Sequence, residues 1–178
     1  MAGLIKGDYP ADSTALTVTN LHSLAASQDW TAGWGSGVIS NVSGEYEDIF
    51  ISASFTTHAS NRQVGEIRVY VIAPISIASG TPTWPASSSG TIGTEGAIAF
   101  TDTEERDAAC AMLDKVIVDN TGSAVMPFPM KAIGHLFGGR IPPAVVLFVA
   151  HNASTTTSAG LASSGSAVYH TPVQSQYT

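Results

Sequence analysis

The residues best able to do chemistry in this chain are its five histidines: His22, His58, His135, His151 and His170. No two of them stand at an i, i+2 or i, i+4 spacing, and the sequence lacks the His-Glu-x-x-His motif of zinc enzymes. His151 and His170 fall in expected strands, and adjacent strands would bring them together. Two histidines without a nearby carboxylate make a poor metal site, whereas strand-end histidines can simply bond to the backbone. We therefore predict no metal and no cofactor.

Nucleophilic and acid–base chemistry has equally little support. No serine has glycine at both i−2 and i+2, so the turn that exposes a hydrolase serine is not encoded. Cys110 lies among apolar residues, where a thiol is more often a small core residue than a nucleophile. Paired carboxylates serve glycosidases, but the close cluster of Glu45, Glu47 and Asp48 is more typical of a solvated strand entrance. We predict no catalytic residues and no enzyme activity.

The charge balance excludes further classes of function. The chain has 178 residues, with 7 Lys and Arg against 14 Asp and Glu, and a net charge of −7. Without a basic surface to neutralise phosphates, we expect no nucleic-acid partner. No run approaches the roughly 18 apolar residues that cross a membrane, and residues 1–10 lack the apolar core of a signal peptide. We expect a protein that folds in a cytoplasm and has no membrane partner.

The elements that would position these side chains are β-strands. Short apolar runs alternate with clusters of Gly, Pro, Ser, Asn and Asp, which is typical of an all-β protein. Residues 46–57 alternate apolar and polar side chains, and we expect residues 64–72 to be the hairpin partner of this strand. Further strands are expected at residues 15–21, 37–42, 97–100, 108–118, 124–130, 144–150 and 167–173, with a hairpin turn at 119–122.

Three segments are expected outside the strands. Residues 80–103 form a long loop, interrupted by the short strand at 97–100. Residues 104–107 form a solvated turn, and residues 133–137 form one helical turn closed by two glycines. About eight antiparallel strands in one domain suit a two-sheet sandwich with jelly-roll topology. We divide the chain into an N-terminal arm, residues 1–12, and a single β-sandwich domain, residues 13–178.

The most apolar stretch, residues 144–150, shows no alternation, which predicts a strand that is buried on both sides. In a two-sheet sandwich the outer face of such a strand needs a cover. That cover is either the loop at residues 80–96 or a neighbouring subunit. The second possibility makes Val146 and Phe148 candidate subunit-interface residues.

Four short motifs occur in a fixed order: Trp30 with Gly33-Trp34 and Ser36, then Glu-Ile-Arg-Val-Tyr at 66–70, Leu-Phe-Gly-Gly-Arg-Ile-Pro at 136–142, and Phe-Val-Ala-His-Asn at 148–152. Together they resemble a family of tailed-bacteriophage virion structural proteins, similar to head decoration, or cement, proteins with a jelly-roll core. The resemblance extends over residues 20–169, except for the loop at 80–96.

The resemblance implies a protein without enzyme activity that binds the outer surface of the phage capsid and stabilises it. Its partner would be the major capsid protein, and binding only the assembled shell shifts the assembly equilibrium toward that shell. The protein would be made in the host bacterial cytoplasm and reside in the virion. The resemblance also implies a homotrimer, since similar decoration proteins cluster at three-fold sites.

Two further hypotheses concern contact surfaces. The apolar residues Leu4, Ile5 and Tyr9 of the arm are candidate capsid-binding residues. The arm would then become ordered only on contact with the shell. Alternatively, the arm is a disordered terminus. The second hypothesis is an alternative function, a carbohydrate- or receptor-binding module on a phage tail, with Tyr70, Trp84 and Tyr169 as its aromatic platform.

Overall fold

Strand β5 (Asp48–Thr56) shows how the sequence pattern becomes a sandwich. Its residues Ile49, Ile51 and Phe55 are completely buried, while the residues between them remain half-exposed. Successive side chains of a strand point to opposite faces, so one face of β5 lies on a core and the other faces outward. The predicted all-β sandwich is confirmed.

The computed structural model describes residues 5–8, 13–41, 46–119, 121–154 and 160–177. The other strands are β1 (Ile5–Asp8), β2 (Thr14–Ala15), β3 (Ala32–Gly35), β4 (Ile39–Ser40), β6 (Gly65–Ile72), β7 (Ser76–Ala78), β8 (Thr81–Thr83), β9 (Gly96–Ala99), β10 (Cys110–Val118), β11 (Val125–Ala132), β12 (Ala144–His151) and β13 (Ala167–Tyr177). One α-helix, α1 (Thr103–Ala109), and one 3-10 helix, η1 (Gly134–Phe137), complete the described elements.

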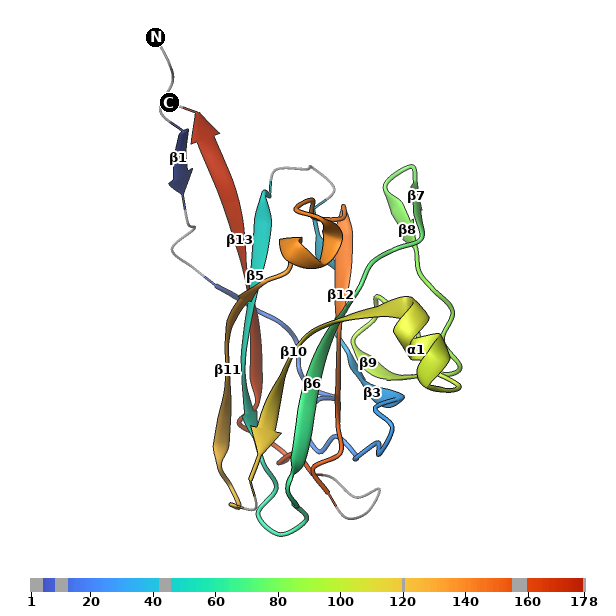
Figure 1. The fold of residues 1–178 in the computed structure, drawn as a ribbon, viewed down its shortest axis with the longest axis vertical. Coiled ribbons are helices and arrows are strands. Elements are labelled where there is room, and N and C mark those ends of the chain that lie inside the picture. The colour runs from blue at the N-terminus through green and yellow to red at the C-terminus, as the bar shows by residue number, and fades with distance from the viewer. Residues whose placement is uncertain (1–4, 9–12, 42–45, 120, 155–159, 178) are drawn as a thin grey trace.

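The described strands form two large antiparallel sheets, shown side by side in Figure 1, and a separate two-stranded sheet of β7 and β8. The first sheet has the order β1-β13-β5-β11, with β2 also beside β13. The second sheet has the order β10-β6-β12-β3-β9, with β4 also beside β12. Four strands of each sheet, β2-β13-β5-β11 and β3-β12-β6-β10, enclose one core. Along the chain these strands pass repeatedly from one sheet to the other, so strands that are far apart in the sequence become antiparallel neighbours. This connectivity is the predicted jelly roll.

Two predicted hairpins are wrong, although the four strands exist. β5 and β6 lie in different sheets, as do β10 and β11. β5 pairs with β11 and β13, whereas β6 pairs with β10 and β12. Each strand buries an apolar face against the other sheet, so the connections at residues 57–64 and 119–124 cross the sandwich instead of closing a hairpin.

The N-terminal part of the sandwich also departs from prediction. Only Thr14–Ala15 is a strand, and residues 16–23 continue as a loop and turns, with Leu21 buried. The glycine-rich β3 was not predicted. A Cβ at Gly33 would lie 2.2 Å from the carbonyl oxygen of Val149, so glycine lets β3 approach β12 closely.

The predicted solvated turn at residues 104–107 is instead part of α1. The helix begins at a cap formed by Asp102, whose carboxylate accepts a hydrogen bond from the Glu105 N–H at 2.8 Å. Arg106 is only 6% exposed, and its guanidinium donates to the backbone carbonyl of Asp29 at 2.5 Å. The predicted helical turn before Gly138 is confirmed as η1, and Gly138 ends it with a φ of 67°.

Two clusters of buried side chains lie on either side of the second sheet. The inner core fills the space between the sheets and includes Trp34, Phe55 and Phe128. The second cluster, here the outer cluster, lies on the outward face of β6 and β12. Its buried members are Tyr70, Ile72, Ile92, Ile98, Phe100, Val146, Phe148 and Ala150. The predicted two-sided burial of β12 is therefore confirmed.

Candidate binding surfaces

The outer cluster is closed by the chain itself. Val146 and Phe148 are both 0% exposed. The Phe148 ring meets Phe100 edge-on at 5.3 Å between centroids and Tyr70 at 5.7 Å. Of the two covers considered for β12, the structure shows the loop at residues 80–96, which contributes Ile92, together with Ile98 of β9 and Phe100 just after it. The assignment of Val146 and Phe148 to a subunit interface is therefore wrong, because their side chains are not available to a second copy.

One carboxylate holds this covering loop in place. Glu95 accepts hydrogen bonds from the Asn20 backbone N–H at 2.8 Å, from the Asn20 side chain at 2.7 Å, and from the Trp34 indole at 2.8 Å. Partial burial tends to raise the pKa of Glu95, but these three bonds outweigh it and lower the pKa below its usual value. Sequence reasoning missed Glu95 because its partners are far away along the chain.

The histidines serve the fold. His151 is fully buried; its Nε2 lies 2.9 Å from the Leu24 carbonyl oxygen and its Nδ1 accepts the Ala153 N–H at 3.2 Å. Burial lowers the pKa of His151, and burial also lowers the pKa of His170. The two histidines do not lie on adjacent strands, because β12 and β13 belong to different sheets. Among the described residues, no group of three or more His, Cys, Asp or Glu is placed to hold a metal ion.

Cys110 stands at the junction of α1 and β10 and is partly buried. Burial raises the pKa of its thiol to about 12, and the nearby Arg106 opposes that rise only in part. The thiol therefore stays protonated at neutral pH, which is the environment of a structural cysteine.

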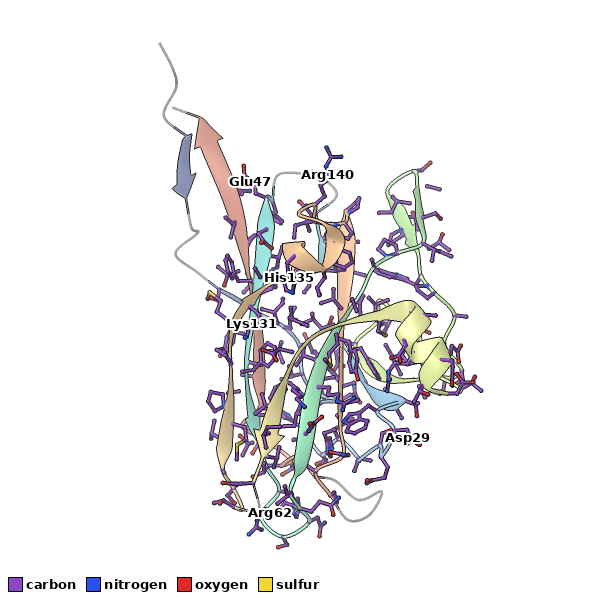
Figure 2. All side chains as sticks on the ribbon, viewed as in Figure 1. Asp29, Glu47, Arg62, Lys131, His135 and Arg140 are labelled. Carbon is purple, nitrogen blue, oxygen red and sulfur yellow. The ribbon has the colours of Figure 1, made fainter. Side chains whose placement is uncertain are left out.

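The acidic cluster lies at the end of the sandwich from which β1 and β13 project. Asp48 accepts the backbone N–H of Ile49 at 2.7 Å and of Gly134 at 2.9 Å, so it holds the start of η1 against β5. Glu47 is exposed, and Glu45 lies outside the described residues. Glu47 and Asp48 line an open cleft of about 690 Å³ together with Arg140. Figure 2 shows Glu47 and Arg140 at this end of the molecule.

A charged network that the sequence did not reveal lies on the outward face of the second sheet. Glu66 binds the guanidinium of Arg68 at 2.8 Å and also pairs with the ammonium of Lys115 on β10. The bond from Lys115 is the main cause of the lowered pKa of Glu66, with Arg68 adding to it against the effect of burial. Arg68 also stacks on Trp30 at 3.6 Å. The alternation of Glu66 and Arg68 on one strand face was the available signal.

The three aromatic residues expected to form a sugar platform do not share one exposed surface. Tyr70 is 3% exposed and belongs to the outer cluster, and Trp84 packs against the same cluster. Tyr169 is 37% exposed, but it lies on β13 in the first sheet.

The expected arm residues are only partly described. Leu4 and Tyr9 lie outside the described residues. Ile5 begins β1, which pairs antiparallel with the C-terminal end of β13 and places Ile5 opposite Tyr177. Figure 1 shows this two-stranded ribbon projecting beyond the body of the sandwich. The predicted contact of Leu4, Ile5 and Tyr9 with a capsid stays a prediction.

Comparisons of this chain with protein-family models, with curated proteins and with solved structures find no match. Within the described part of the chain, no helix is long and apolar enough to cross a membrane.

Proposed function

We propose that this protein is a non-enzymatic structural protein of a tailed bacteriophage that binds the outer surface of the capsid and stabilises it. The jelly-roll fold agrees with the family that the sequence motifs resemble. The proposed partner is the major capsid protein. The proposed location is the outside of the virion, where a chain of net charge −7 has no DNA to repel it.

The observation that carries this proposal is the difference between the two outer sheet faces. On the second sheet, the chain covers one part of the outward face, where Tyr70, Val146 and Phe148 are at most 3% exposed. The other part, with Glu66, Arg68 and Lys115, stays partly exposed and is charged. On the first sheet, Ser52 and Ser54 of β5 are half-exposed, and Tyr169 of β13 is 37% exposed.

The outward face of this sheet adds the exposed side chains of Val125 and Tyr169 to the serines of β5, so it offers both polar and apolar contacts to a large partner. An interface of ordinary size buries about 800 Å² per partner. Many copies with modest affinity still stabilise a shell, because every shell site is repeated and each bound copy favours the assembled state. The face of β13-β5-β11 is therefore the proposed shell-contact surface.

Co-sedimentation with phage heads that lack this protein tests the proposal. We expect saturable binding, with hundreds of copies per head. Ser54→Arg, which places a long charged side chain on the proposed contact face, should weaken binding at least tenfold. Thr94→Arg, on the exposed covering loop of the other sheet, is the matched control and should bind normally. Absence of the wild-type protein from the head pellet would contradict the proposed function.

Replacing Leu4 and Tyr9 by serine tests the predicted arm contact while leaving β1 (Ile5–Asp8) in place. If Leu4, Ile5 and Tyr9 contact the shell, this double variant should bind heads more weakly while keeping its folded β spectrum and its mass in light scattering. Unchanged head binding would remove the arm from the contact and leave the sheet face as the proposed surface.

A further inference from the structure

The sandwich edges formed by β10 and β11 are protected against pairing with a foreign strand. β10 has an irregularity between Met112 and Asp114, and β11 contains Pro127 and Pro129, which have no N–H to donate. An ion pair of 2.6 Å between Asp114 and Lys131 bridges these two edge strands. Bulges, edge prolines and charges are the devices by which native sheets avoid edge-to-edge pairing.

The projecting ribbon is built differently. β1 pairs with residues 174–177 of β13 through four register positions, and β1 contains neither a proline nor a register shift. Among the described residues, no other strand pairs with β1. A ribbon of two strands has little stability by itself in water, so it is stabilised when it packs against something further.

A second two-stranded element stands on the opposite side of the same end of the molecule, the hairpin of β7 and β8 (Figure 1). Ser79 and Gly80 close it with positive φ values of 49° and 79°, as a tight hairpin turn requires. Pro82 removes a donor from β8, which leaves β7 as the edge able to pair.

An open groove lies between α1 and the residues that flank this hairpin, Ile75 and Pro85. It consists of two adjoining hollows of about 320 and 200 Å³ that share Ile75, Pro85, Ala108 and Ala109. Ile75, at the foot of β7, is 71% exposed, the largest exposed fraction among the large apolar residues described. Asp107 of α1 lines the larger hollow and Glu105 the smaller one, so the groove has an acidic rim, in which Asp107 also pairs with Arg106.

We propose that the β1–β13 ribbon of one copy of this protein seats in the groove between the β7–β8 hairpin and α1 of the next copy, which joins copies head to tail into a ring. β1 contains Lys6, which is complementary to the acidic rim. Asp8 balances the charge of Lys6, so β1 itself adds no net charge to the contact.

The positions of the β1–β13 ribbon and of the groove within one molecule indicate why the ribbon in the groove belongs to a second copy. Figure 1 shows the ribbon and the hairpin on opposite sides of one end, so a chain presents its ribbon away from its own groove. Two different surfaces of one chain then meet in each contact, and such a contact closes into a ring when the rotation permits. A ring of three would give the homotrimer that the sequence resemblance implies. This inference does not depend on capsid binding.

A cross-linking experiment between two differently labelled chains tests the contact directly. Cys110→Ser removes the native thiol, and the two single-cysteine chains then carry Ser175→Cys on the ribbon or Ile75→Cys in the groove. Mixing them with a short bismaleimide should give covalent heterodimers. Val64→Cys is the matched control for Ile75→Cys, because Val64 is 69% exposed but lies beside the first residue of β6, far from the groove. Cross-linking at Val64 equal to that at Ile75, or none at either, would overturn the proposal.

Light scattering during gel filtration gives the second test. The wild-type protein at micromolar concentration should have a mass of more than one chain. Ile75→Asp, which puts a charge on an exposed position facing an acidic rim, should raise the dissociation constant at least tenfold, and Val64→Asp should leave it unchanged. A wild-type mass of one chain, or self-association that survives Ile75→Asp, would contradict the ring. Either result would leave the capsid proposal standing.

Discussion

At the scale of single residues, the buried imidazole of His151 couples stability to pH. Burial lowers the pKa of His151 and of His170 in the folded chain, whereas the unfolded chain has ordinary histidine pKa values near 6.5. The unfolded state therefore binds more protons below pH 6.5. The stabilisation is complete above that pH and is lost as the pH falls.

Urea unfolding at pH 7.5, 6.0 and 5.0 measures this effect. The free energy of unfolding should fall below pH 6.5, with each histidine contributing at most about 1.4 kcal/mol per pH unit. His151→Gln should be less stable at pH 7.5 but should lose less on acidification. Val149→Ala, a destabilising change without a titrating group, should keep the full pH dependence. Equal slopes for His151→Gln and wild type would show that this imidazole does not govern acid stability.

Phe148 tests the outer cluster at the same scale. Its ring is completely buried between Phe100 and Tyr70, so Phe148→Ala should lower the free energy of unfolding by about 3–5 kcal/mol. Because the chain itself provides the cover, this loss should be the same at low and high protein concentration. Val64→Ala, at a mostly exposed position, should change stability by less than about 0.5 kcal/mol. A loss that grows with concentration would return Phe148 to a subunit interface.

At the scale of elements, the covering loop depends on a single charged acceptor. Glu95→Gln removes the charge that accepts hydrogen bonds from Asn20 and Trp34, and it should destabilise the protein by about 1–3 kcal/mol. Since the folded pKa of Glu95 is lowered, the wild-type contribution is present above about pH 4.5 and is lost as the pH falls. Thermal unfolding at pH 7 and pH 4 checks both points, with the exposed Glu104→Gln as control. A Glu95→Gln variant as stable as wild type at pH 7 would contradict this role.

Edge protection is a second property of elements. Replacing both Pro127 and Pro129 of β11 by threonine restores two N–H donors to an edge strand. The double variant should aggregate faster at 37 °C than wild type, measured by light scattering and thioflavin binding, because a continuous edge accepts foreign strands. Val125→Thr introduces threonine on the same strand without restoring an N–H donor, so this control variant should not aggregate. Unchanged solubility of the double variant would show that the other edge features suffice.

At the scale of the whole molecule, the two proposals concern different surfaces. The shell contact is assigned to the outward face of β13-β5-β11, and the copy-to-copy contact to the ribbon and the groove beside α1. A ring presents several shell-contact faces at once, so its binding to a head is multivalent.

Ile75→Asp should therefore still bind phage heads, but with an affinity reduced at least tenfold, because single chains lose multivalency. Binding to heads over a range of protein concentrations measures this, and Val64→Asp should bind as wild type. Identical head affinity for single chains and wild type would show that self-association does not contribute to shell binding.

The local pattern of the sequence determined which segments become strands where that pattern is strong. The alternation in β5 and β6, and the unbroken apolar run of β12, reflect contacts that a strand makes whichever neighbours it has. These signals sufficed for an all-β sandwich, although not for the pairing of its strands. The N-cap of α1, Asp102 with Glu105 three residues later, is also a recognisable sequence signal, but the run of charges at residues 104–107 favours a solvated turn instead.

Only the tertiary structure decided which strands pair and what covers each face. β5 and β6 are close along the chain, yet they face each other across the core, because both need apolar neighbours on the opposite sheet. Whether Val146 and Phe148 meet a loop or another subunit depends on Ile92, Ile98 and Phe100, and no local pattern records that long-range contact. The same holds for the projecting ribbon, which joins the two ends of the sequence and exists only once the sandwich brings them together.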